Sequence, residues 1–211
     1  MSERQGGGSM VASRVIAVPA GQIATIVTCL EMTAPPPPTA PVKSALKLER
    51  WTAPFDLARY RALFRAIGQP WLWRGRLVLD DEALAATLSA PGLEVHVATR
   101  RDGTPQGLLE LDFSGPGECE LAYVGLVPEL TGRGHGAWLM GHALKRAWTE
   151  QHARPPITRV WVHTCDLDHP GALGFYQRHG FRPYERLVEI YDDPRRSGLY
   201  PADTAPAVPL L

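Results

Sequence analysis

Two apolar segments near the start of the chain, Val11–Val18 and Ile23–Met32, flank a Pro-Ala-Gly sequence at residues 19–21. Proline and glycine in this order favour a tight turn between two strands. Polar residues, Arg14 and Gln22 among them, interrupt the apolar stretch, so it does not resemble a signal peptide. The pattern therefore predicts an added N-terminal β-hairpin.

The next segments alternate between helical and extended patterns. In Asp56–Ile67, apolar side chains recur at helical spacing, and Gly68 follows as a helix end. A short helix is expected after Asp80 or Asp81, either of which can cap its start. Longer helical patterns cover Gly136–Gln151 and the segment from Pro170 to Gly180. Strands are predicted at Ala45–Trp51, Leu93–Thr99, Gly107–Phe113, Glu118–Val127, Thr158–Thr164 and Phe181–Tyr191.

The ends of the chain differ in composition from this central part. Residues 1–9 are rich in glycine and polar side chains, which predicts disorder. The hairpin and a proline-rich stretch, Ala34–Pro41, make up residues 10–41, and the prolines favour a stiff extended linker. Residues 42–193 form the predicted main domain. Residues 194–211 are rich in proline and alanine and are expected to be a loose tail.

Composition limits the classes of function. Of the 211 residues, 45% are hydrophobic, which is enough for a sizeable core. The 22 basic residues balance the 22 acidic ones, so nothing indicates a nucleic-acid or membrane-surface partner. No apolar run reaches the ~18 residues of a membrane span. Three cysteines without paired spacing indicate free thiols in the cytoplasm.

The turn after Val127 holds three alternating glycines, Gly132, Gly134 and Gly136, and a helical pattern follows directly. Glycine allows a backbone to approach a ligand closely, and a helix start offers free N–H donors. Together they form a cradle for phosphate groups. A nucleotide P-loop would need a lysine after the glycines, and a dinucleotide site would need Gly-x-Gly-x-x-Gly near the first strand. Neither pattern is present.

Two motifs resemble those of the GNAT N-acetyltransferase family. Thr131-Gly132-Arg133-Gly134-His135-Gly136 is similar to its pyrophosphate loop, Gln/Arg-x-x-Gly-x-Gly/Ala, with threonine in the first place. The later segment His169–Arg182 is similar to Asn-x-x-Ala-x-x-x-Tyr-x-x-x-Gly-Phe, with histidine in the first place. The matching residues of this second motif are Ala172, Tyr176, Gly180 and Phe181.

The resemblance implies an α+β fold of the GNAT type. Its mixed, mostly antiparallel sheet splays between two central parallel strands and carries helices on both faces. Acetyl-CoA would lie in the splay as co-substrate, and its acetyl group would pass directly to a primary amine in a ternary complex. The residues implied to bind the carrier are Val124, Gly125, Leu126, Val127, Thr131, Gly132, Arg133, Gly134, His135, Gly136, His169, Ala172 and Tyr176.

Two residues are candidates for proton transfer. Tyr176 matches the family's tyrosine near the sulfur, and a phenol with a pKa of about 10 can protonate a departing thiolate. Glu120 lies where some family members carry a base, so its carboxylate can relay the amine proton through water. A buried core tyrosine and an exposed strand glutamate remain the alternatives. A backbone N–H near Gly125 or Leu126 would polarise the thioester carbonyl, and Gly125 is consistent with a β-bulge or with close packing.

The acceptor-binding candidates come from several segments. Trp71, Trp73 and Arg74 form an aromatic and cationic loop after the first helix, although both tryptophans can instead cover the core. An arginine here indicates an acceptor with a carboxylate or phosphate. Glu118 shares a strand face with Glu120. His163 is expected near the splayed strand end.

The same strand end invites a metal interpretation, because Cys165, Asp166, Asp168 and His169 follow His163 closely. No Cys-x-x-Cys or His-x-x-x-His spacing is present, so no metal is predicted. Cys165 has no evident activating partner and is expected to be structural.

Two other functions remain open at this stage. The protein can be a non-catalytic acyl-CoA sensor on the same fold. It can also be an interaction module, in which the N-terminal hairpin pairs with a partner strand or with a second copy to form a homodimer. The predicted acceptor of the enzyme is a small molecule or a peptide amine.

Overall fold

A computed structural model describes residues 15–38, 40–149 and 155–210. Within these ranges, seven strands form one sheet in the order β2-β3-β4-β5-β6-β1-β7. The strands are β1 (Gln22–Met32), β2 (Lys47–Trp51), β3 (Leu93–Thr99), β4 (Pro105–Asp112), β5 (Glu118–Leu126), β6 (Arg159–Cys165) and β7 (Arg182–Asp192). The helices are α1 (Leu57–Gly68), α2 (Asp81–Leu88), α3 (His135–Trp148) and α4 (Ala172–Arg178), with 3₁₀ turns at Gln69–Trp71 and Pro128–Leu130.

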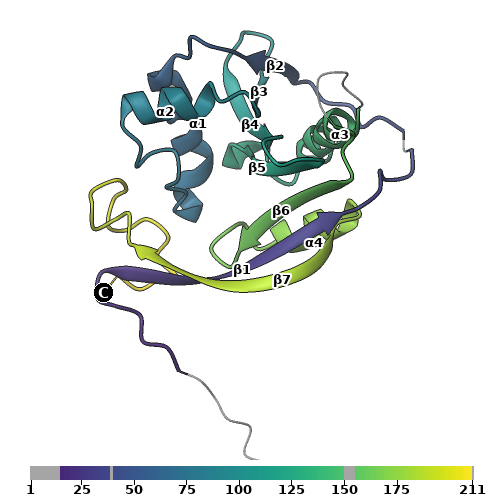
Figure 1. The fold of residues 1–211 in the computed structure, drawn as a ribbon. Coiled ribbons are helices and arrows are strands. Elements are labelled where there is room, and N and C mark those ends of the chain that lie inside the picture. Colours follow the sequence, from purple (N-terminus) through teal and green to yellow (C-terminus); the bar gives the residue numbers. More distant parts are fainter. Residues whose placement is uncertain (1–14, 39, 150–154, 211) are drawn as a thin grey trace, which may run out of the picture.

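The sheet splits between β5 and β6, its one parallel pair. Pairing runs from Glu118 opposite Arg159 to Glu120 opposite Trp161 and stops there, although both strands continue. Figure 1 shows the result: β2–β5 curve away from the half formed by β6, β1 and β7. The neighbouring strands on either side are antiparallel. This arrangement confirms the predicted α+β fold and its splay.

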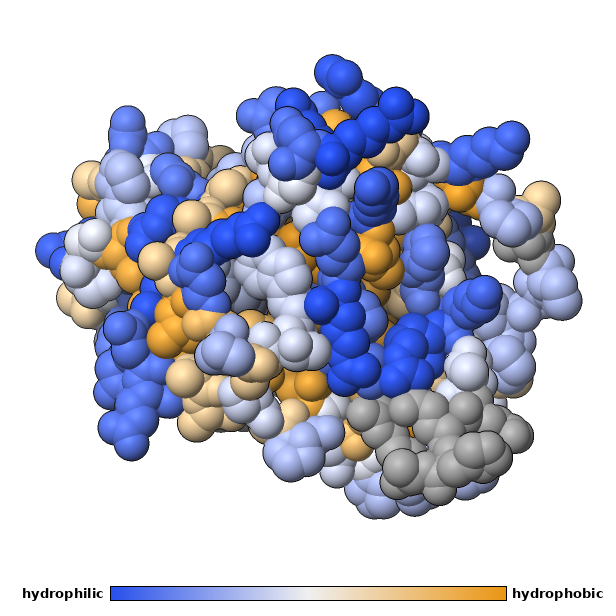
Figure 2. Space-filling model, turned by 90° about the horizontal axis from the view of Figure 1, so that it is seen from above, coloured by the Kyte–Doolittle hydropathy of each residue, from blue (hydrophilic) through white to orange (hydrophobic). Residues whose placement is uncertain are grey.

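Helices cover both faces of the sheet and build two cores. On one face, buried side chains of α3 pack with Tyr176 of α4 and with Phe181. On the other face, α1 and α2 pack with Tyr200 from the C-terminal segment. Seen from above, the outer surface is mostly hydrophilic, with hydrophobic residues in separate smaller areas (Figure 2). The predicted presence of helices on both faces is thus confirmed.

Local capping explains where the helices near the candidate acceptor loop begin. The carboxylate of Asp56 accepts a hydrogen bond of 2.9 Å from the Arg59 N–H at the start of α1. Asp80, and not Asp81, caps α2 by accepting one of 2.8 Å from the Ala83 N–H. Each cap satisfies a donor that the first helical turn leaves free.

The predicted N-terminal hairpin is wrong. Residues 15–18, the described part of Val11–Val18, are exposed and form no strand, and residues 11–14 lie outside the described ranges. The predicted strand Ile23–Met32 does form, as part of β1, but it lies inside the sheet, antiparallel to both β6 and β7. β7 pairs with Gln22–Glu31 of β1 and β6 pairs with Val27–Met32, so the strand partners of β1 are these two and not residues 15–18. Residues 22–32 therefore belong to the same sheet as the domain predicted at 42–193.

The C-terminal segment is also not the loose tail that its composition predicted. Residues 194–210 form a series of turns, held by backbone hydrogen bonds such as Leu199 N–H to Pro194 C=O at 3.0 Å. The buried residues of this segment include Arg195, Tyr200 and Thr204. The proline and alanine content did not predict this order, because individual buried residues and not the average composition stabilise the segment. In contrast, the proline-rich stretch 34–41 has neither helix nor strand in its described residues.

Candidate active site

A cavity of about 940 Å³ lies where β5 and β6 separate. Its lining comes mainly from the end of β5, the glycine turn before α3, the end of β6, α4 and the loop after α1, and single residues of α1 and β1 and two of β7 complete it. Because β5 and β6 no longer pair beyond Glu120, the gap between them is open to a ligand at this level. The sheet therefore supplies a slot whose walls come from both halves of the splay.

The glycine turn has a backbone conformation that favours glycine. Gly132 and Gly134 have φ values of +76° and +84°, which residues with a Cβ rarely adopt. An added Cβ at either residue would meet no atom within 4 Å, so the strain is in the backbone and the space beside it is open. Gly134 is the N-cap of α3. The turn thus presents the start of a helix to the cavity without side chains in the way.

The residues of this turn divide into two groups. Thr131, Gly132, Gly134 and Gly136 line the cavity. Arg133 is exposed and is not part of the lining, and His135 turns away, with its Nδ1 at 2.8 Å from Ser44 Oγ. The structure thus brings the glycines to the cavity but not these two basic side chains.

The end of β5 also lines the cavity, through Val124, Gly125 and Leu126, whereas Val127 is buried in the core beside α1. The strand does contain a bulge, but at Ala122: Glu110 of β4 faces Tyr123 and Leu111 faces Leu121. Gly125 is instead a packing glycine. A Cβ there would lie 2.4 Å from Ile67 Cγ2 and 2.9 Å from Trp73 Cη2.

Tyr176 lies on α4 and lines the cavity, with 8% of the residue exposed. Burial raises the pKa of its phenol, and the nearby Asp168 carboxylate raises it further. The hydroxyl therefore keeps its proton at neutral pH. Ala172 also lines the cavity, as does His169, whose Nδ1 accepts a hydrogen bond of 3.0 Å from the Gly171 N–H at the start of α4.

Asp168 is a residue of the cavity that sequence analysis considered only as a metal ligand. Its carboxylate accepts hydrogen bonds from Trp73 Nε1 at 3.0 Å, Thr164 Oγ1 at 2.8 Å and the Cys165 N–H at 3.0 Å. These donors belong to the loop after α1 and to the end of β6. Asp168 therefore links the loop to the far side of the splay. The local pattern of a polar turn before Pro170 gave no sign of the contact with Trp73.

Glu120 and His163 form a pair at the base of the splay. Glu120 Oε1 lies 3.4 Å from His163 Nδ1. His163 lines the cavity with 49% of its side chain exposed, whereas Glu120 stands behind it at 23%. The Glu120 carboxylate raises the pKa of the imidazole. Glu118 is not brought to the cavity and pairs with Arg159 at 3.2 Å.

The loop after α1 forms the opposite wall. Trp73 fits between two glycines, because a Cβ at Gly68 would lie 2.4 Å from Trp73 Cβ, and one at Gly125 would meet the far edge of the ring. Its ring also packs on Phe64 and Tyr123, at centroid distances of 5.5 and 5.2 Å. Trp73 therefore covers the core and lines the cavity at once, and Trp71 lines the cavity beside it.

Arg74 of this loop meets residues of β7 that the sequence did not single out. Its guanidinium lies over the Tyr191 ring, 4.1 Å from the centroid, and 3.5 Å from Glu189 Oε1. Both β7 residues line the cavity. Cys165 lies close by, and burial raises the pKa of its thiol, which favours the protonated form. No group of three or more His, Cys, Asp or Glu side chains suited to a metal ion occurs among the residues with described positions.

Residues 57–181, more than half of the chain, match the Acetyltransferase (GNAT) family. The protein therefore belongs to this family. The match runs from the start of α1 to the residue before β7, so it includes the glycine turn, the splayed strands and Tyr176. Family membership implies acetyl-CoA as the acyl donor. No curated protein matches the sequence.

Similar solved structures share the fold. A GCN5-related N-acetyltransferase from Sphaerobacter thermophilus has a TM-score of 0.57 at 17% identity, over 80% of this chain and 52% of that one. A functionally unknown protein from Staphylococcus epidermidis has a TM-score of 0.54 at 12% identity, over 82% and 64%. A protein of the GNAT family from Novosphingobium aromaticivorans has a TM-score of 0.51 at 17% identity, over 84% of this chain and 69% of that one. The chain thus spans less than two thirds of the first two proteins, and identities this low show the fold alone.

In the part of the chain that the structure describes, no helix is both long and apolar enough to span a membrane.

Proposed function

We propose that this acetyltransferase transfers acetyl from acetyl-CoA directly to a primary amine within a ternary complex. The observation that carries the proposal is one continuous cavity, which runs from the glycine turn through the splay to the wall of Trp71, Trp73 and Arg74. Donor and acceptor can therefore meet in one space. Direct transfer needs no covalent enzyme intermediate, which agrees with the protonated thiol of Cys165.

The donor half of the cavity suits the carrier. The N–H groups at the start of α3 and the positive end of the helix dipole favour a diphosphate at Gly132 and Gly134. The N–H groups on the β6 side of β5 beyond Glu120 lie outside the strand pairing. They can bind the pantetheine arm along Val124–Leu126, and one of them can polarise the thioester carbonyl. Ala172 and His169 would border the carrier from α4.

We assign the proton acceptor to His163, with Glu120 behind it. The amine must lose a proton before or during its attack on the thioester. His163 faces the cavity and Glu120 does not, so the imidazole, directly or through a water, can take the proton, while Glu120 stabilises the resulting cation. This assignment changes the predicted role of Glu120 from base to partner of the base.

Tyr176 is the proposed proton donor to the leaving thiolate. Its hydroxyl belongs to the cavity lining, and its raised pKa keeps it protonated until the thiolate appears. Attack by the amine nitrogen forms the amide bond and breaks the carbon–sulfur bond. The sulfur then receives a proton from the phenol, and solvent reprotonates the phenol.

The acceptor half of the cavity favours an amine with an apolar or aromatic part. Trp71 and Tyr191 supply aromatic faces, which also attract cationic amines. Arg74 stacks on Tyr191 and faces Glu189, so this edge offers one cation and one anion to a polar acceptor. Both charges are partly exposed and available to bind a substrate group.

A thiol-release screen tests the proposal. Purified protein and acetyl-CoA are combined with simple amines, amino acids, polyamines, aminoglycosides and peptides, and free thiol is measured against a blank without amine. We expect at least one class to raise the release rate, and the Gly134→Glu variant to abolish the increase by placing a carboxylate where the diphosphate binds. Binding of acetyl-CoA without any amine-dependent release would contradict the proposal and favour a non-catalytic sensor.

A further inference from the structure

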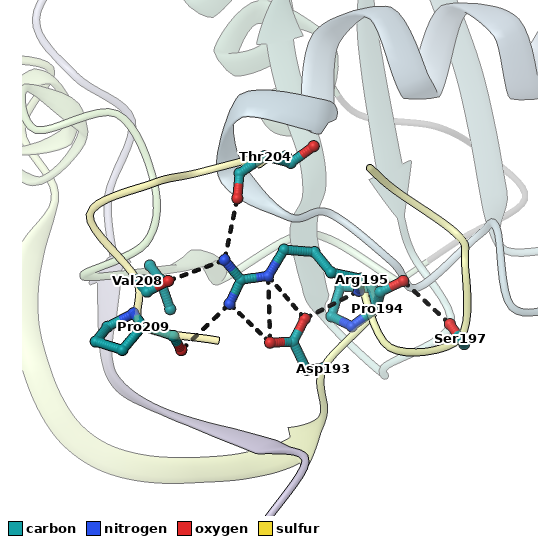
Figure 3. Close-up of polar contacts among 7 residues, drawn as sticks. All are labelled: Asp193, Pro194, Arg195, Ser197, Thr204, Val208 and Pro209. Carbon is teal, nitrogen blue, oxygen red and sulfur yellow. Dashed lines mark hydrogen bonds and ion pairs between the residues drawn. The ribbon is translucent and has the colours of Figure 1, made fainter. Parts of the chain in front are cut away.

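The C-terminal segment after β7 is closed into a ring by one buried arginine (Figure 3). The side chain of Arg195 is 1% exposed and forms an ion pair with Asp193, with 2.7 Å between Nη2 and Oδ2. The same guanidinium donates hydrogen bonds to the backbone carbonyls of Thr204 at 3.1 Å, Val208 at 2.9 Å and Pro209 at 3.4 Å. Arg195 thus joins the beginning of residues 193–209 to their end.

The middle of this ring contacts the loop that forms the acceptor wall. Tyr200, only 2% exposed, donates a hydrogen bond of 2.5 Å from its hydroxyl to the backbone carbonyl of Trp73. Arg65 of α1 donates to the Leu199 carbonyl at 2.5 Å and lies over the Tyr200 ring. The ring is therefore held against α1 at the point where the chain leaves this helix for the loop.

The segment also continues directly from the other wall of the acceptor site. Asp193 follows Asp192, the last residue of β7, and this strand carries Glu189 and Tyr191. Arg74 meets both of these side chains from the loop side. The ring is thus covalently joined to one wall and hydrogen-bonded to the backbone of the other.

We infer that residues 193–209 act as a brace that sets the distance between the two acceptor walls, with Arg195 and Tyr200 as positioning residues. The inference rests on the proposed function, because it concerns the acceptor half of the same cavity. The brace lies outside residues 57–181, the part of the chain that matches the family. The hydrogen bonds that Leu199 and Tyr200 make outside the segment go to Arg65 of α1 and to Trp73 of the acceptor loop, so the brace is expected to act on the acceptor half of the cavity.

The Tyr200→Phe variant tests the brace with the least change in packing. The aromatic ring of residue 200 still fills the core, and only the hydroxyl that donates to the Trp73 carbonyl is lost. We expect the KM for the acceptor to rise about three- to tenfold, the range of one lost hydrogen bond, while kcat and the KM for acetyl-CoA change less than twofold. Tyr184→Phe is the matched control, because it removes a phenol hydroxyl from β7 outside the cavity lining. It should leave all three constants unchanged.

Hydrogen exchange of the loop tests the brace even without a known acceptor. The amides of Leu72, Trp73, Leu77 and Val78 are hydrogen-bonded within residues 68–78 and report the order of this loop. In Tyr200→Phe and in Arg195→Met they should exchange several times faster than in the wild type, and Arg195→Lys should restore only part of the protection, since one ammonium cannot reach all the acceptors of the guanidinium.

The two readouts separate failure of the brace from failure of the proposed function. Unchanged exchange in the loop of Tyr200→Phe overturns the brace. Faster exchange with an unchanged acceptor KM overturns it as well, because the loop would then move without effect on the acceptor. If no amine is turned over by the wild type, the proposed function fails, and the exchange rates alone decide whether the brace exists.

Discussion

Glu120 Oε1 and His163 Nδ1 lie 3.4 Å apart on the two parallel strands, at the level where these strands separate. Glu120 belongs to the last paired position of β5, and His163 follows two residues after its partner Trp161. The pair therefore spans the floor of the splay, with the imidazole toward the cavity. This placement makes the base of the proposed reaction sensitive to a carboxylate that does not itself reach the substrate.

The pH dependence of the rate tests this pair. Glu120 raises the pKa of His163, Asp168 and Glu189 add to the increase, and burial opposes it. Since only the neutral imidazole accepts a proton, kcat/KM should rise with pH through an apparent pKa above the ordinary value of about 6.5. In Glu120→Gln this limb should move to lower pH, because the main cause of the increase is removed. A limb that stays in place would show that the two side chains are not coupled.

His163→Gln examines the same step from the other side. Removal of a general base costs roughly 10²- to 10⁴-fold in rate, so kcat should fall by at least the lower figure and the acidic limb should disappear. Binding of acetyl-CoA, measured by calorimetry, should be unchanged, since the imidazole is assigned to the acceptor amine. A variant with normal kcat would leave His163 as part of the wall only.

A pair of glycine substitutions in and beside α3 separates backbone strain from helix propensity. Gly134 has φ +84°, so Gly134→Ala should cost about 1–2 kcal/mol of stability and weaken acetyl-CoA binding at the turn. Gly141, in the middle of α3, has open space around it and no positive φ. Gly141→Ala should therefore gain about 0.5–1 kcal/mol without changing affinity. Thermal unfolding and calorimetric binding measure both effects, and equal behaviour of the two variants would contradict the assigned role of the turn.

Much of the fold follows from local signals. Helical periodicity, the Asp56 cap and the glycines with positive φ act within a few residues, so the helices and strands predicted from residue 23 onwards agree with those observed apart from their exact ends. The glycine turn and the helix that carries Tyr176 were predicted for the same reason, because each is a short segment whose conformation depends on its own residues. Both line the cavity.

The features that sequence analysis missed depend on distant residues. The place of β1 between β6 and β7 is decided by two strands more than a hundred residues away in the chain. The position of Asp168 in the site depends on its hydrogen bond with the Trp73 indole. The role of Arg195 depends on backbone carbonyls whose positions are set by the turns of the C-terminal segment. At Gly125 the sequence left a bulge and close packing open, and the contacts with Ile67 and Trp73, which lie outside β5, show that close packing is the reason for the missing side chain.

Gly125→Ala should therefore act on the acceptor side. The new methyl group would lie 2.4 Å from Ile67 Cγ2 and 2.9 Å from the Trp73 ring, which forces the ring to shift. Overpacking of this kind costs about 1–3 kcal/mol of stability. We expect the acceptor KM to rise more than the KM for acetyl-CoA, with Gly141→Ala as the control for an added methyl group in open space. The reverse ranking of the two KM values would place the acceptor elsewhere.

Tyr176→Phe tests the proton donor to the departing thiolate. The phenol is buried against Phe175 and Phe181, with ring centroids at 5.5 and 5.9 Å, so the phenylalanine fills the same space and the fold should not change. Loss of a general acid should lower kcat by roughly 10²-fold or more, while the KM values for amine and acetyl-CoA change little. An acetyl donor with a more acidic leaving thiol needs less help from a proton, so such a donor should recover part of the lost rate. If kcat is unchanged and only thermal stability falls, Tyr176 is a core tyrosine, and the thiolate must take its proton from water.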